Sequence, residues 1–476
     1  MIGKKNGFTG FLRPSTWLSK NPLGLLGAAL ALSSGIAMVG YWIATFLNRV
    51  HSNPYISIFH FLILPGIFLL GLLLMLVGLL LKLRVSRQVV DTAEGFSLAQ
   101  QLGLYRKPMA ILFAVVCVNL LVIAYAGYRG ARYMETPGFC GRACHVMKPE
   151  HVAYMSSAHA NIACTECHVG SGGRAQANAK FNGIRQLFEV MLHRYPRPIA
   201  APVDSLRPAR EICESCHKGT QFFGEKFVVK NTFADDEQNS QTKSVLQLHV
   251  GGMNAIGQAS GIHGVHLGHI EYIAGDDARS VIPWVEKTES NGSRTVYAAS
   301  STGSKMPLGK IRLMDCTDCH NRTAHVHETA EEALNHAMAD GRVNPQLPYI
   351  RREALRILKM DFASQEIARQ GIMLEVEVFY KNNYPRDYAA WRNTIHSTAL
   401  QLANLYEQNV FPDMKVKWET RTNNIGHTSS PGCFRCHDGD HGTSGAAKTI
   451  TNDCAACHNL LAVDEKNPKL LTDLRL

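Results

Sequence analysis

Residues 139–168 read FCGRACHVMKPEHVAYMSSAHANIACTECH and contain two cysteine pairs, each followed directly by a histidine. The second pair has the spacing C-x-x-C-H, and four more pairs with this spacing follow along the chain. The first pair is one residue wider, at Cys140, Cys144 and His145. Of the 13 cysteines, only Cys117 lies outside these six motifs, so the motifs decide how the chain folds.

The C-x-x-C-H spacing is the signature of covalent haem attachment, because two thiols add to the vinyl groups of one porphyrin and the adjacent imidazole binds the iron. Zinc sites would need two pairs for each ion, and disulfides would leave every following histidine unexplained. We therefore expect six covalently bound haem c groups. The attaching cysteines are Cys140, Cys144, Cys164, Cys167, Cys213, Cys216, Cys316, Cys319, Cys433, Cys436, Cys454 and Cys457.

Each iron also needs ligands on its two faces. The motif histidines are the expected proximal ligands: His145, His168, His217, His320, His437 and His458. Beyond residue 128 the chain holds 13 further histidines, more than the six distal ligands that six haems can take. Irons with two histidine ligands would be closed electron carriers, whereas an open iron would mark a substrate site.

The N-terminal quarter of the chain predicts a membrane anchor. Three uncharged apolar stretches, about 23–48, 55–81 and 109–128, are each long enough to cross about 30 Å of hydrocarbon. Residues 1–128 carry ten Lys or Arg and two acids, which argues for a membrane surface and against nucleic acid. Nine of these ten basic residues precede the first stretch or lie between the second and third, and only Arg49 lies between the first and second. The N-terminus is therefore expected in the cytoplasm and the haem domain in the periplasm of a bacterial inner membrane.

The rest of the chain is organised around the motifs. We expect a mainly α and irregular periplasmic haem domain with a small β-rich insertion, and a hairpin whose turn is SNG at 290–292. A helix between 172 and 195 would lie on the membrane or cover a haem. The expected segments are a membrane anchor (1–128), a module with haems one to three (129–217), a β-rich insertion (218–312), a haem four segment (313–345), a helical hairpin broken at Pro385 (346–412) and haems five and six (413–476).

The quoted stretch, followed by KFNGIRQ, RPARE and CESCH, resembles the NapC/NirT family of membrane-anchored cytochromes. The longer pattern, with DCHNRTAH, NVFPDMKVKWETRTNNIGH and PGCFRCHDGDH, is similar to the larger inner-membrane multihaem branch of that family. The resemblance covers about residues 134–460. It implies a quinol dehydrogenase that oxidises menaquinol at the periplasmic face and passes electrons to periplasmic c-type cytochromes.

The resemblance also implies roles for individual residues. Met147 matches a methionine that replaces the motif histidine as iron ligand in some relatives, so either His145 or Met147 binds the first iron. Lys180 falls where relatives place a quinol-site lysine, and Gln186 stands where some carry an acid. The expected distal ligands are His159, His249, His263 or His266, His325, His427 and His441.

Two other functions fit the same motifs. The chain would be an electron wire if another membrane subunit, rather than its own quinol site, supplied the electrons. It would be a terminal reductase of a small oxyanion if one iron were open. The number of candidate distal histidines argues against the reductase.

Overall fold

The computed structural model describes residues 22–46, 63–90, 98–170, 173–203, 206–218, 224–253, 259–267, 269–289, 291–303, 305–445 and 447–473. The chain divides into two compact units, Met1–Glu135 and Thr136–Leu476. Each unit has its own internal packing.

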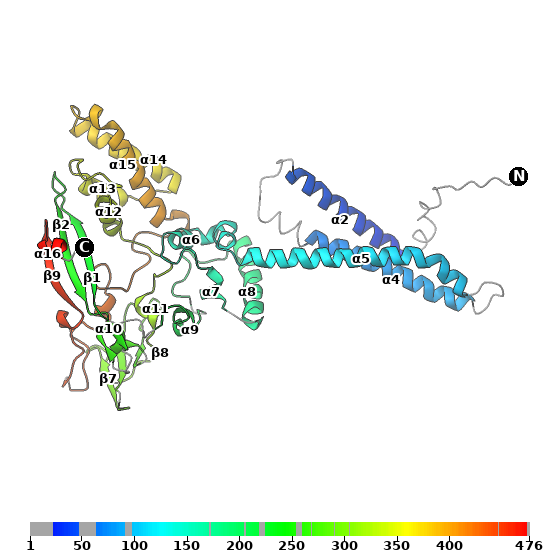
Figure 1. Ribbon diagram of the computed structural model, residues 1–476, viewed down its shortest axis with the longest axis horizontal. Helices are drawn as coiled ribbons and strands as arrows, with labels where there is room; N and C mark the ends of the chain where they lie inside the picture. The colour runs from blue at the N-terminus through cyan, green and yellow to red at the C-terminus, as the bar shows by residue number, and fades with distance from the viewer. Residues whose placement is uncertain are drawn as a thin grey trace. The chain divides into compact units, whose positions relative to one another are not determined.

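The described part of the first unit consists of the helices α2 (Pro22–Phe46), α4 (Leu64–Val90) and α5 (Leu98–Met134) (Figure 1). Small residues let α2 and α4 pack closely. A Cβ atom added to Gly27 would lie 2.6 Å from the carbonyl oxygen of Gly71, and one added to Gly71 would lie 2.6 Å from the Ala31 nitrogen. Only glycine fits at both positions, because the two backbones meet there.

The described residues support one membrane-spanning helix, so the prediction of three spans is corrected. Residues Pro22–Tyr41 of α2 form a stretch of 20 residues with a mean hydropathy of 1.9, long and apolar enough to cross a membrane. In α4 the corresponding described stretch, Leu64–Gly78, is shorter than the ~20 residues that a crossing requires. Among the residues that the search covers, no span is identified in α5.

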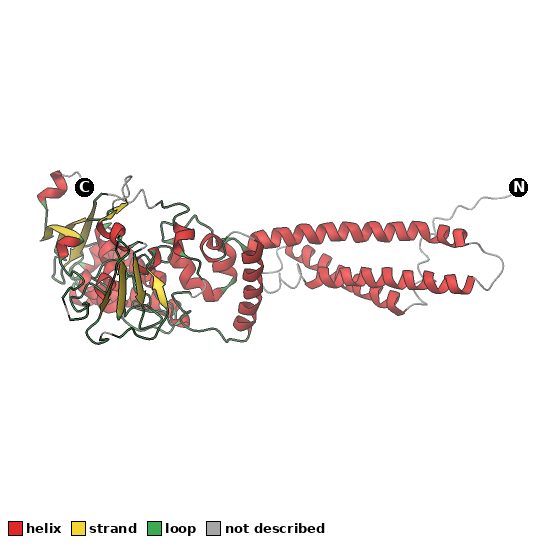
Figure 2. Cartoon of the chain, turned by 90° about the horizontal axis from the view of Figure 1, so that it is seen from below, coloured by secondary structure: helices red, strands yellow, loops and turns green. Residues whose placement is uncertain are grey.

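The second unit begins with short turns and helices that carry the first three cysteine pairs, and loops connect most of its elements (Figure 2). These elements are the π-turn η3 (Phe139–Ala143), the 3-10 turn η4 (His145–Met147), α6 (Lys148–Met155), α7 (Cys164–His168), α8 (Gly173–Met191) and α9 (Ala209–Cys213).

Two antiparallel sheets and a two-stranded ribbon follow. Their orders are β1-β2-β9, β7-β6-β5-β8 and β3-β4. β6 and β7 form the predicted hairpin, with Gly292 in its turn at a φ of +82°. The third strand of the first sheet, β9, comes from the C-terminal end of the chain, so this sheet combines strands from residues 218–312 with a strand from outside that segment. The strands are β1 (Lys226–Phe233), β2 (Gln241–Leu248), β3 (Gly252–Met253), β4 (Ala259–Ser260), β5 (Ile270–Ile273), β6 (Trp284–Thr288), β7 (Arg294–Ala298), β8 (Ile311–Leu313) and β9 (His458–Glu465).

The remaining elements are the helices α10 (Gly261–His266), α11 (Cys316–Cys319), α12 (Ala330–Ala339), α13 (Ile350–Leu358), α14 (Gln365–Asn383), α15 (Tyr388–Asn409) and α16 (Lys469–Asp473), with the 3-10 turns η6 (Pro412–Met414), η7 (Gly432–Arg435) and η8 (Cys454–Ala456). The chain breaks between α14 and α15 beside Pro385, as predicted. Residues 349–408 form three helices rather than the predicted two, because Ser364 caps a new helix by accepting a hydrogen bond from the Ile367 nitrogen.

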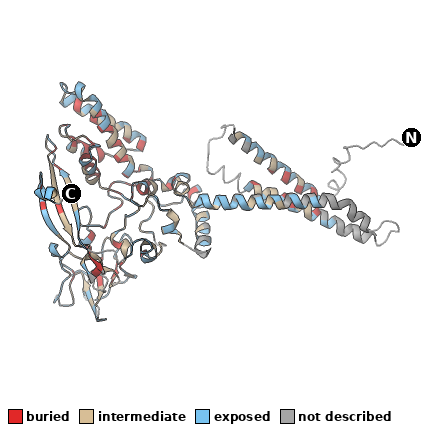
Figure 3. Ribbon diagram, viewed as in Figure 1, coloured by how far each residue is buried: buried red, intermediate tan, exposed pale blue. Residues whose placement is uncertain are grey.

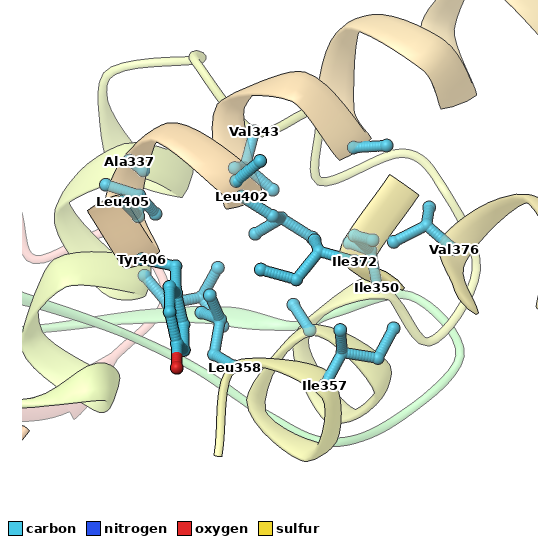
Figure 4. Packing of buried hydrophobic residues seen from close by; sticks show 14 of the residues in the cluster. Ala337, Val343, Ile350, Ile357, Leu358, Ile372, Val376, Leu402, Leu405 and Tyr406 are labelled. Atoms are coloured by element: carbon cyan, nitrogen blue, oxygen red, sulfur yellow. The ribbon is translucent and has the colours of Figure 1, made fainter. Parts of the chain in front are cut away.

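The largest apolar core of the second unit lies among α12, α13, α14 and α15, where Figure 3 shows buried residues gathered. Ile357, Ile372 and Leu402 are fully buried there and point toward one another (Figure 4). Trp418 closes one side and donates a hydrogen bond of 2.9 Å from its indole nitrogen to the Leu358 carbonyl. The apolar clusters nearer the cysteine pairs contain far fewer residues.

Truncating this core should destabilise the protein much more than truncating its surface. Ile372→Ala removes a fully buried side chain from α14, and we expect it to lower the free energy of unfolding by about 2–5 kcal/mol. Ile367→Ala on the same helix is the matched control, because that side chain is 52% exposed. Urea unfolding of both full-length variants, followed by far-ultraviolet circular dichroism, measures the difference. Equal losses would show that the bundle is not a packed core.

Candidate haem sites

Each regular cysteine pair lies on or beside a short helical turn. The turn at Cys316 is fixed by a capping box, in which Asp315 accepts a hydrogen bond from the Thr317 nitrogen and Asp318 accepts one from the Asp315 nitrogen, both of 2.8 Å. Residues three apart on a helical turn face the same side, so Cys316 and Cys319 present both thiols to one ligand. Asp453 caps the last motif in a related way, by accepting a hydrogen bond of 3.0 Å from the Ala455 nitrogen.

The wider first motif is accommodated by a different helical turn. Residues Phe139–Ala143 form a π-turn, which takes one residue more per turn than an α-helix does. This keeps Cys140 and Cys144 on one side of the backbone despite the inserted residue. The turn is tightly packed, because a Cβ atom on Gly141 would lie 1.9 Å from the ring of His151.

Five of the six motif histidines each face a second histidine from a distant part of the chain. The two rings of each pair lie face to face or tilted across a gap. The pairs, with the distances between ring centroids, are His159 and His217 (6.1 Å), His168 and His325 (6.1 Å), His263 and His320 (6.1 Å), His266 and His437 (5.7 Å) and His427 and His458 (6.1 Å).

This separation fits an iron between the rings. An imidazole nitrogen lies about 2 Å from a bound first-row metal, so two opposed nitrogens stand about 4 Å apart. The distance from each nitrogen to its ring centre adds about 1 Å on either side, which gives about 6 Å between centroids. The five pairs therefore have the spacing that a haem iron with two histidine ligands requires.

In several of these pairs, a hydrogen bond at Nδ1 leaves Nε2 available to bind iron. The Nδ1 atoms of His325, His266 and His437 lie 2.9, 2.7 and 2.6 Å from the carbonyl oxygens of Glu150, Ile262 and Thr451. A carbonyl only accepts, so each Nδ1 carries the proton and each Nε2 keeps the lone pair that a metal binds. Burial, together with the nearby His437, lowers the pKa of His266 and favours the neutral ring that ligation needs.

Two of the expected distal ligands are not placed opposite a motif histidine. His441 is buried with both ring nitrogens occupied, since Nδ1 lies 2.9 Å from Asp438 and Nε2 lies 2.7 Å from the Ile282 carbonyl. It therefore cannot offer a lone pair to iron. His249 instead holds Glu225 at 2.7 Å. His263 and His266, which the sequence treats as alternatives, both face motif histidines, because they lie three residues apart on α10.

The first site differs from the other five. The ring beside His145 is that of Tyr195, with centroids 6.3 Å apart and planes at 79°. His145 is exposed, whereas Met147 is half-buried at the end of η4. Tyr195 is a neighbour that the motifs alone do not reveal.

The two expected quinol-site residues both lie on α8. Gln186 is exposed there, and the backbone places Lys180 six residues earlier on the same helix. At 100° per residue the two positions are about 120° apart around the helix, so they do not share one face. Phe181, Ile184 and Phe188 line α8 at helical spacing and are exposed.

A partly buried acid supports one of the histidine pairs and was not anticipated from the sequence. Glu150 follows the first motif, and its carboxylate lies 3.0 Å from Arg421, 3.5 Å from His325 and 3.9 Å from His327. Burial alone would raise the pKa of Glu150, but His327, His325 and Arg421 hold it at about 2. The Glu150 backbone carbonyl orients His325, so this ion pair fixes a candidate iron ligand.

The chain is similar to known c-type cytochromes. A family model described as the N-terminal region of the NapC/NirT cytochrome c family matches residues 105–199. The chain is 33% identical to the cytochrome c-type protein ImcH of Geobacter sulfurreducens over 96% of this chain and 91% of that protein. It is 28% identical to the cytochrome c nitrite reductase subunit NrfH of Nitratidesulfovibrio vulgaris over 26% of this chain and 76% of that protein. No solved structure matches.

Replacing one distal histidine should change one haem only. We expect His263→Met to raise the midpoint potential of a single haem and to remove one low-spin signal of the two-histidine type from the electron paramagnetic resonance spectrum, because a thioether stabilises ferrous iron. His396→Met on α15 is the control, since His396 is exposed in the helical bundle. A spectrum that His263→Met leaves unchanged would contradict the pairing of His263 with His320.

Proposed function

Because the chain belongs to the NapC/NirT family of c-type cytochromes, we propose that it is an inner-membrane hexahaem cytochrome that oxidises menaquinol at the periplasmic face. In this proposal it relays the electrons to periplasmic c-type cytochromes. The family implies covalently bound haem c and a role in electron transfer. The count of six haems, the quinol and the acceptor are the parts that we propose.

The proposal rests on a difference between the first candidate haem site and the other five. At five sites a pair of histidines stands ready to close the iron, which suits electron transfer and leaves no position for a substrate. At the first site the motif histidine faces Tyr195 instead. A small-oxyanion reductase would need an open iron deep in the protein, whereas the first site follows α5 by only a few residues.

The surroundings of the first site suit a lipid-soluble donor. α8 presents Phe181, Ile184 and Phe188 with exposed fractions of 73%, 53% and 57%. An aromatic and aliphatic face of this kind favours the ring and the isoprenoid tail of a quinol, or the membrane surface from which the quinol arrives. α2 supports attachment to that membrane, and the basic residues Lys4, Lys5, Arg13 and Lys20 before it favour a cytoplasmic N-terminus.

Oxidation of a quinol releases two electrons and two protons, so the protein must supply a proton acceptor as well as an electron acceptor. Haem iron, when bound, accepts the electrons one at a time. Lys180 and Gln186 are the proposed quinol-site residues: a neutral lysine amine accepts a proton, and a glutamine amide orients the hydroxyl by hydrogen bonding. Because the two positions lie on different faces of α8, we expect one of them to dominate.

The test is anaerobic stopped-flow absorbance of the fully haem-loaded protein mixed with a soluble menaquinol analogue. We expect fast haem reduction that a quinol-site inhibitor blocks. Removal of a proton acceptor typically costs 10²–10⁴-fold, so Lys180→Ala should slow reduction by quinol by about 100-fold while reduction by dithionite is unchanged. Gln186→Ala removes only a hydrogen bond to the hydroxyl and should slow reduction by quinol by about tenfold.

Asn178→Ala, which changes an exposed residue of the same helix, is the control and should reduce at the wild-type rate. Wild-type protein that dithionite reduces but quinol does not would contradict the proposal. That result would favour an electron wire fed by another membrane subunit.

A further inference from the structure

The cysteine pairs lie next to one another in space in the order in which they occur in the sequence. The thiols of Cys140 and Cys164, from the first and second motifs, share a hydrogen bond that raises the pKa of Cys164. Cys213 and Cys316, from the third and fourth motifs, share another, which raises the pKa of Cys213. These motifs therefore touch through the atoms that would carry the porphyrins.

The other neighbouring motifs are linked in the same order. Gly170, just after the second motif, packs against Arg207, just before the third: a Cβ atom added to Gly170 would lie 2.4 Å from the Arg207 guanidinium. Cys433 of the fifth motif neighbours both Cys319 of the fourth and Cys457 of the sixth.

Hydrogen bonds and ring contacts join the later motifs independently. The Ala209 nitrogen, just before the third motif, lies 3.4 Å from the carboxylate of Asp315, which caps the fourth. Arg435, between the cysteines of the fifth motif, donates a hydrogen bond of 2.8 Å to the carbonyl of Asp318 in the fourth. Phe434 of the fifth motif stacks at 4.2 Å on His427, which faces the motif histidine of the sixth.

We propose that the six attachment sites form one unbranched row in sequence order, and that electrons leave the protein at the sixth site, across the exposed edge strand β9. The row follows from the contacts between consecutive motifs. Its two ends are the first site, near the end of α5 in sequence, and the sixth site at Cys454, Cys457 and His458. The assignment of the exit rests on the relay function proposed above.

The surface at the sixth site suits a protein partner. β9 starts at His458 and forms the edge of the sheet β1-β2-β9. Leu460, Leu461 and Val463 on this strand are 56%, 38% and 55% exposed, an apolar group unusual for an edge strand in contact with water alone.

Charged residues around this patch indicate the chemistry of the partner. Exposed Asp453, Asp464 and Glu465 border it, against Lys466 and Lys469, so the border is slightly acidic. The partner that fits is a small soluble c-type cytochrome whose exposed haem edge has an apolar centre and a basic rim. Each transfer oxidises one ferrous iron of this protein and reduces one ferric iron of the partner, with no bond or proton exchanged.

The exit is tested by reducing the full-length protein with limiting dithionite and mixing it with an oxidised soluble monohaem cytochrome c at low salt. Leu460→Lys combined with Val463→Lys keeps all six attachment motifs but places two cations in the apolar patch, where they would repel the basic rim of the partner. We expect the second-order rate of electron transfer to fall by about tenfold, with the haem content unchanged. Ile367→Lys on α14, which changes another exposed apolar residue, is the control and should transfer at the wild-type rate.

Removing the sixth haem tests the same exit in a second way. Cys454→Ser with Cys457→Ser should leave five reducible haems and lower the same rate by about tenfold or more. If this variant loses further haems, the transfer rate of the β9 surface variant alone tests whether electrons leave at the sixth site. An unchanged transfer rate in the β9 variant would overturn the exit.

The order of the six attachment sites is tested separately, by measuring haem potentials. In a potentiometric titration, removal of the sixth haem should shift the potential of one remaining haem, because a terminal site has one neighbour. Removal of the fourth haem, through Cys316→Ser with Cys319→Ser, should shift two. Two shifted haems after removal of the sixth would overturn the unbranched row. Dithionite supplies the electrons in the transfer assay, so a missing quinol site would leave both readouts intact.

Discussion

The structure depends on the opposition of two imidazole rings across a gap of about 6 Å, repeated at five places. Each pair joins distant segments: His325 reaches back to His168, and His159 faces His217. The apolar clusters around the motifs are small, so packing alone gives little reason for these segments to meet. Covalently bound haem c, which the family implies, would supply that reason, since a metal that ties two segments stabilises the fold by its own binding free energy.

A conventional core is found where the cysteine pairs are absent. The bundle of α12, α13, α14 and α15 buries Ile357, Ile372 and Leu402 completely and is linked to the first motif by a hydrogen bond of 2.7 Å from Lys148 to Gln365. The second unit thus has one core of aliphatic side chains, and the proposed haems would form another. Beside the first motif, the partly buried Glu150 pairs with the buried Arg421, and the Glu150 carbonyl also orients His325. Replacing Glu150 would leave the buried Arg421 without this partner, next to a candidate iron ligand.

Much of the site could be predicted from the sequence because covalent attachment has a fixed local spacing. His263 and His266 could not be told apart by pattern, and in the structure both face motif histidines, because they lie three residues apart on α10. The sequence predicts His441 as a distal ligand because its surrounding residues resemble a family segment. In the structure its Nε2 contacts the Ile282 carbonyl, which is distant in sequence and could not be foreseen. The pairing of β2 with β9 could not be predicted either. The alternation of apolar and polar residues along a strand shows which face is buried, but it does not show which strand pairs with it. Counting apolar stretches predicted three spans, and the described residues support one.

The central claim is that all six motifs, including the wider one at Cys140 and Cys144, hold a haem and so form the interior of the second unit. Intact-mass spectrometry of the purified full-length protein under denaturing conditions tests it most directly, since thioether-bound haem stays on the chain. The account predicts a single species that carries six haems on its 12 motif cysteines. A homogeneous species with five haems, and with Cys140 and Cys144 open to alkylation, would contradict it.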